Sequence, residues 1–160
     1  MSYRLDLPDI SVIFTQKAVT AVQRSERGVL CVIVKDKQQT TGIKKYVYKR
    51  LADITETDYE TSNFTALKRA FDVAVNKVYV LRCATETTLQ DIVKELDKIK
   101  FNYVCTNVKA LQQDLANQVV QYNKDNQGHK CVAVVSEATQ ADSKYVINLK
   151  GSGGDRKSVV

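Results

Sequence analysis

Short apolar runs recur along the chain from residue 29 onward, and they predict β-strands. The runs are VLCVIV (29–34), KVYVLRCA (77–84), FNYVC (101–105), HKCVAVV (129–135) and KYVINL (144–149). Most of their positions are apolar, which is typical of strands with both faces buried. A further run, IKKYVYKR (43–50), mixes lysine with tyrosine and predicts an edge strand or a hairpin arm.

Three segments between these runs carry apolar residues at helical spacing. They are NFTALKRAFDVA (63–74), TLQDIVKELDKI (88–99) and VKALQQDLANQVVQY (108–122). Thr88 stands where a capping residue would begin the second helix, and Gly128 stands where the third would end. Alternating strands and amphipathic helices predict an α/β fold, with a mostly parallel sheet flanked by helices on both faces and joined by right-handed crossovers.

A short apolar run, ISVIF (10–14), precedes this regular region and predicts an extended N-terminal β-arm. The length of 160 residues suits one domain with a real core. We therefore divide the chain into an arm and turn (1–27), an α/β domain (28–150) and a flexible loop or truncation point (151–160).

No apolar run approaches the roughly 20 residues that span a bilayer, and the N-terminus lacks the pattern of a signal peptide. We expect a soluble protein that is made in a cytoplasm and does not enter a membrane.

The formal net charge of +6 is concentrated near the N-terminus, where residues 1–50 hold ten Lys/Arg against four Asp/Glu. Such asymmetry indicates a partner with an acidic surface. Lysines interleaved with Tyr46 and Tyr48 allow a nucleic-acid-binding module over residues 35–50. The same lysines on an edge strand would simply deter edge-to-edge pairing, and we favour this interpretation.

No catalytic constellation emerges from the sequence. The four cysteines lie within or beside apolar runs without a CxxC pair, which predicts buried free thiols, not a metal or disulfide site. The GSGGDRKS end has Arg156 where a phosphate loop needs glycine. A nucleotide-binding α/β enzyme stays open as an alternative, with its ligand beyond the carboxyl ends of the strands. We expect no cofactor and no metal.

The N-terminal third resembles the start of contractile tail sheath proteins of bacteriophages and phage-tail-like bacteriocins. The resemblance rests on an apolar run beginning with LP, a turn of the form A-x-T-A-x-x-R-S-x-R-G, and an apolar strand that ends in KD. In this chain they are Leu7, Pro8, Ile10, Val12 and Phe14, then Ala18, Thr20, Ala21, Arg24, Ser25, Arg27 and Gly28, then Val29 to Asp36. The later order of strands and helices extends the resemblance to about residues 5–150.

The resemblance implies a structural, non-enzymatic subunit of a contractile tail sheath. Its expected partners are other copies of itself in a helical sheath, a tail tube protein, and baseplate and tail terminator proteins; nucleic acid is not expected. The expected location is a virion tail or tail-like particle, assembled in the cytoplasm of a host bacterium. Family members are longer and carry a second arm and a tube-facing helix in their C-terminal part. The end at Val160 therefore predicts a truncation point, with a naturally short sheath-like protein as the alternative.

The resemblance also implies that terminal arms link neighbouring subunits by adding strands to a sheet. In this chain the arm would be residues 4–16. It would pair through Ile10, Val12 and Phe14 on one side and Ser11 and Ile13 on the other, and Leu7 also belongs to the arm. Arg24, Glu26 and Arg27 are candidate interface charges in the turn that follows.

Overall fold

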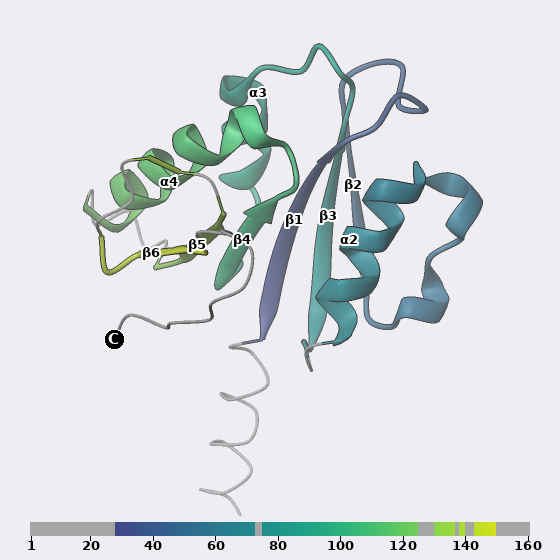
Figure 1. Cartoon of the computed structure of the whole chain (residues 1–160), viewed down its shortest axis with the longest axis horizontal. Coiled ribbons are helices and arrows are strands. Elements are labelled where there is room, and N and C mark those ends of the chain that lie inside the picture. Colours follow the sequence, from purple (N-terminus) through teal and green to yellow (C-terminus); the bar gives the residue numbers. More distant parts are fainter. Residues whose placement is uncertain (1–27, 73–74, 125–129, 137, 140–142, 150–160) are drawn as a thin grey trace, which may run out of the picture.

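Within its described residues, the computed structural model shows a six-stranded sheet with helices against both faces (Figure 1). The structure describes residues 28–72, 75–124, 130–136, 138–139 and 143–149. The strands lie in the order β2-β3-β1-β4-β5-β6. Their bounds are β1 Val29–Lys35, β2 Ile43–Tyr48, β3 Lys77–Cys83, β4 Tyr103–Thr106, β5 Val132–Val135 and β6 Val146–Asn148.

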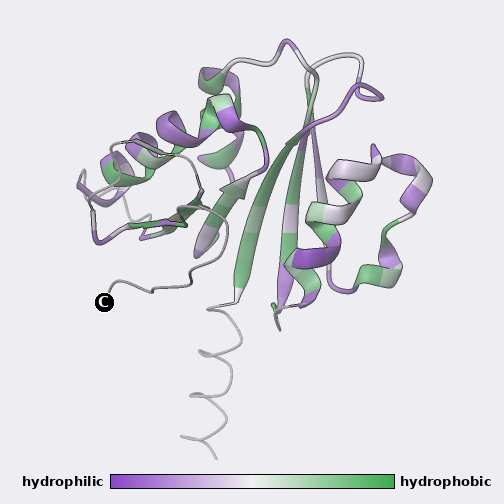
Figure 2. Ribbon diagram, in the orientation of Figure 1, coloured by the Kyte–Doolittle hydropathy of each residue, from purple (hydrophilic) through white to green (hydrophobic). Residues whose placement is uncertain are grey.

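Every neighbouring pair of strands is parallel except β2 with β3, so the predicted α/β class and mostly parallel sheet are confirmed. β1 lies at the centre between β3 and β4, and in Figure 2 it is mostly green, the colour of hydrophobic residues. β2 lies at the edge and pairs with β3, not with β1, although it follows β1 in the chain. The edge-strand prediction is therefore correct, because polar positions are tolerated where one side of a strand faces water.

In the part of the chain that the structure describes, three α-helices pack against the sheet: α2 Thr61–Asp72, α3 Leu89–Leu96 and α4 Lys109–Lys124. α3 and α4 pack on one face and form the larger core, which contains Ile33, Leu81 and Val104 from the strands. α2 packs on the other face and buries Leu67 against Val34 and Val80. Two short 3₁₀ helices, η1 Leu51–Asp53 and η2 Glu56–Asp58, connect β2 to α2.

The start of α3 confirms the predicted cap. The Thr88 hydroxyl accepts a hydrogen bond from the backbone N–H of Asp91 at 3.3 Å, and it donates one to the Asp91 carboxylate at 2.6 Å. Gly128, the predicted stop after α4, lies outside the described residues. None of the described helices is long and apolar enough to cross a membrane.

All four cysteines are free thiols, as predicted. Cys31, Cys83 and Cys131 are buried in the larger core, whereas Cys105 is only half-buried and faces the α2 side of the sheet. Burial raises the pKa of Cys83 to about 12 and that of Cys105 to about 11. These thiols are therefore protonated at neutral pH and react slowly, which fits a packing role.

Candidate functional site

The residues that the sequence assigns to subunit contacts fall in the N-terminal segment 1–27, outside the described residues. They are Leu7, Ile10, Ser11, Val12, Ile13, Phe14, Arg24, Glu26 and Arg27. Their roles, and the domain boundaries at 27 and 151, stay predictions. The described residues offer three places where function could lie: the carboxyl ends of the strands, the β2 edge, and the half of the sheet around β6.

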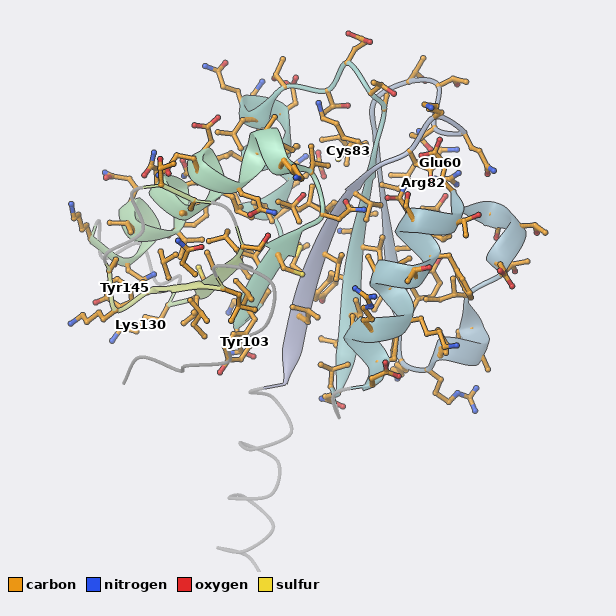
Figure 3. The ribbon with its side chains drawn as sticks, in the orientation of Figure 1. Glu60, Arg82, Cys83, Tyr103, Lys130 and Tyr145 are labelled. Carbon is orange, nitrogen blue, oxygen red and sulfur yellow. The ribbon has the colours of Figure 1, made fainter. Side chains whose placement is uncertain are left out.

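The carboxyl ends of the central strands meet in a buried polar network around Asp36, which directly follows β1. Its carboxylate accepts hydrogen bonds from the side chain of Asn63 at 2.9 Å and from Arg82 Nη2 at 3.3 Å. It also accepts the backbone N–H groups of Gln38 at 2.9 Å and Glu60 at 3.0 Å. Figure 3 places Arg82 and Glu60 side by side at this end of the sheet. The carboxylate is therefore fully occupied by the fold.

The charges of this network are balanced inside the protein. Burial raises the pKa of Asp36, but hydrogen bonds from Asn63, from two backbone N–H groups and from Arg82 outweigh it, so the pKa lies below its usual value. Arg82 stacks over the Tyr59 ring at 4.9 Å, and Gln38 Oε1 accepts a second bond from Nη2 at 3.1 Å. The Nε atom of Arg82 is buried without a hydrogen-bond partner among the described residues. The ion pair between Asp36 and Arg82 connects the carboxyl end of β1 to that of β3.

This arrangement bears on the nucleotide-binding alternative, because open α/β sheets bind ligands at the carboxyl ends of their strands. The Asn63 oxygen is also occupied, by the Asn107 side chain that follows β4, at 2.7 Å. A groove of about 520 Å³ nearby lies between residues 40–43 and α3, where Lys94 and Lys98 are paired with Asp91 and Glu95. Within the described residues, no three His, Cys, Asp or Glu side chains gather as metal ligands. The Asp36 and Asn63 side chains therefore bond within the fold.

The β2 edge carries the basic and aromatic residues considered for nucleic acid. Lys44 and Lys45 are exposed, but Tyr46 and Tyr48 are half-buried toward α2 and stack on each other, with ring centroids 6.0 Å apart. The Tyr48 hydroxyl also lies 3.0 Å from that of Tyr59. The rings pack internally, so they do not form a stacking platform for bases, and the lysines act as edge charges.

The third place is the face of β4, β5 and β6 that lies on the α2 side of the sheet, which we call the open half. α2 packs over β1, β2 and β3, and no helix of the described residues covers the open half (Figure 1). Its side chains are half-buried or exposed: Tyr103, Cys105, Val132, Val134, Ile147 and Leu149. The expected cover of both faces is thus incomplete in the described residues. The sequence carries no signal for this uncovered region, because the apolar positions of a strand do not indicate which helix covers them.

Comparison with known proteins points to a phage tail. No protein-family model matches the chain. The chain is similar to a tail sheath protein of Clostridium phage phiCD119, with 26% identity over 155 residues. The match covers 89% of this chain and 41% of the phage protein, so the chain spans about two fifths of its relative. This similarity supports the tail sheath relationship that the N-terminal pattern indicated.

Proposed function

We propose that this chain is a structural subunit, or a part of one, of a contractile tail sheath that polymerises around a tail tube. The observation that carries the proposal is the similarity to the phage tail sheath protein over 89% of the chain. The structure adds physical support: the buried polar groups at the strand ends bond to one another, and apolar side chains are exposed on the open half. Exposed apolar surface is typical of proteins that assemble.

In this proposal the subunits rotate and move outward on a signal from the baseplate and drive the tube through a cell envelope. The subunit contacts a tail tube protein, and the sheath ends at baseplate and tail terminator proteins. The protein catalyses no reaction. The particle is a virion tail or tail-like particle that is assembled in the host cytoplasm.

Residues 4–16 would link copies by pairing with a neighbour's sheet. Main-chain hydrogen bonds would supply most of the linkage and alternate side chains its register. Arg24, Glu26 and Arg27 would contribute less, because exposed ion pairs are worth only about 0–1 kcal/mol each.

Deletion of residues 1–16 tests this proposal. Electron microscopy of the parent chain, alone or co-expressed with a tail tube protein, should show striated tubes, and the deletion variant should show none. Circular dichroism and urea unfolding should show that its α/β domain still folds. A variant with Lys17→Ala, just beyond the arm, is the matched control and should still polymerise. Full-length tubes from the deletion variant would contradict the role of the arm.

A further inference from the structure

We infer that copies of this chain contact one another through two surfaces of opposite charge on opposite sides of the domain. The first surface, which we call the basic corner, consists of Lys100, Lys130 and Lys144 at the amino ends of β4, β5 and β6. The second, which we call the acidic connector, is the segment of residues 53–60 between β2 and α2. The inference rests on the proposed function and names the surfaces through which its subunits would meet.

The basic corner brings together three exposed lysines from separate segments of the chain. Because β4, β5 and β6 are parallel, the residues that precede them lie at the same end of the sheet. The N–H of Val132 donates to the Asn102 carbonyl at 2.9 Å, and that of Ala133 donates to the Tyr145 carbonyl at 3.0 Å. Figure 3 shows Lys130 close to Tyr145 at this end. The fold itself therefore holds the three lysines on one surface.

The charges of the basic corner are not neutralised within the part of the chain that the structure describes. None of the three lysines forms an ion pair with a described residue. The Lys144 ammonium group lies over the Tyr145 ring, 5.1 Å from its centroid. Asp142, two positions before Lys144, lies outside the described residues, so Lys100 and Lys130 are the lysines to test. Like charges gathered at one place create a positive potential that favours an anionic partner.

The acidic connector offers the matching charge. Its four acidic residues are Asp53, Glu56, Asp58 and Glu60. Asp53 and Glu60 have basic partners in the same copy. Glu56 and Asp58 are exposed on η2 and form no ion pair with a described residue. These two carboxylates are therefore available to the lysines of another copy.

The positions of the two surfaces suit a contact that repeats. β2, which leads into the acidic connector, and β6 form the two edges of the described sheet. The connector lies at the right of Figure 1, beside α2, and Lys130 lies at the left of Figure 3 in the same view. The basic corner of one copy can therefore meet the connector of the next while its own connector stays free. A contact of this head-to-tail kind closes into a ring or continues as a helix, as subunits of a sheath would require.

Charge reversal on each surface tests this contact. One variant carries Lys100→Glu and Lys130→Glu, and a second carries Glu56→Lys and Asp58→Lys. Each variant alone should need at least about tenfold more protein than the parent chain to form tubes, because like charges then meet. Sedimentation and electron microscopy measure this concentration, and circular dichroism checks the fold of each variant.

A mixture of the two variants should form tubes near the concentration that the parent chain needs. In the mixture the glutamates of one variant meet the lysines of the other, at both surfaces. The matched control carries Lys44→Glu and Lys45→Glu, two exposed lysines of β2. It changes the net charge as much as the first variant does, and it should assemble like the parent chain.

The outcomes separate this inference from the proposed function. Tubes from either reversal variant at the concentration of the parent chain would overturn the inference and leave the sheath proposal standing. So would a mixture of folded variants that does not assemble, or a control that loses assembly equally. Salt-sensitive binding of the parent chain to DNA that only the lysine reversals remove would assign the basic corner to nucleic acid instead. A parent chain that forms neither tubes nor oligomers would contradict the sheath proposal and, with it, the inference.

Discussion

Replacing Asp36 by asparagine would show whether the polar network at the strand ends holds the fold together. The Asp36 side chain has no exposed surface, and the Arg82 side chain is only 10% exposed. Asp36→Asn keeps the size of the side chain but replaces one acceptor oxygen with an N–H₂ group among donors. It also leaves the Arg82 guanidinium in the interior without its counter-ion.

The expected loss follows from this geometry. Removing one partner of a buried ion pair costs about 3–5 kcal/mol. The Gln38 oxygen at 3.1 Å and the Tyr59 ring at 4.9 Å still contact the Arg82 cation, so we expect the lower end of that range. Arg82→Met should cost less, about 1–2 kcal/mol, because Asp36 keeps three of its four donors.

Urea unfolding followed by far-ultraviolet circular dichroism at neutral pH measures both losses. The double variant should lose less than the sum of the two single losses, because the second substitution removes a group that the first has left unpaired. A loss below about 1 kcal/mol for Asp36→Asn would refute the reasoning, since exposed pairs contribute that little. Stabilisation of the parent chain by nucleotides that disappears in Asp36→Asn would point instead to a ligand site.

The pH dependence of unfolding gives an independent check. The pKa of Asp36 is lower in the folded protein than its ordinary value of 3.8, because its hydrogen bonds outweigh the effect of burial. The carboxylate therefore stabilises the fold fully above the unfolded pKa, and this stabilisation is lost as the pH falls through the lower folded pKa. Below about pH 4, the parent chain should lose stability more steeply than Asp36→Asn.

Three further predictions concern single positions. A thiol reagent should modify all four cysteines slowly in the folded protein, with the half-buried Cys105 first, and Cys105→Ser should remove that first reaction; fast reaction of any thiol would contradict the burial of the cysteines. Thr88→Ala should lower the free energy of unfolding by about 1 kcal/mol, with Thr87→Ala as the control that leaves the cap intact. Gly42→Ala should cost about 1–2 kcal/mol, because Gly42 has φ +65° and no steric clash to add, and an unchanged urea midpoint would contradict this.

Local pattern was sufficient to predict the regular elements. The spacing of Ile92 and Leu96 predicts α3, and Thr88 marks its start, because helical period and capping are properties of neighbouring residues. The strand order depends on contacts between distant segments. The separation of β2 from β1 arises because β1 and β3 are both apolar and pair with each other, which leaves the lysine-bearing strand at the edge.

The sequence indicates that the charges at the strand ends need partners, but it does not identify the partners. Asp36 and Arg82 each interrupt or end an apolar strand, and a charge in such a place needs a partner. Nothing in the sequence says that these two residues, 46 positions apart, are partners. The pairing follows from the parallel register of β1 with β3, which sets Val34 beside Arg82 just before Asp36.

Polar and apolar groups are distributed differently over the strand ends and the open half. At the carboxyl ends of the strands, where a ligand would bind, the Asp36 carboxylate and the Asn63 side chain are occupied by hydrogen bonds within the fold. On the open half, where a helix would normally pack, apolar side chains such as Tyr103 and Ile147 are exposed. An exposed apolar part of a sheet face gains free energy when another chain covers it. Exposed apolar side chains on the open half are typical of proteins that assemble, in keeping with the similarity to the tail sheath protein.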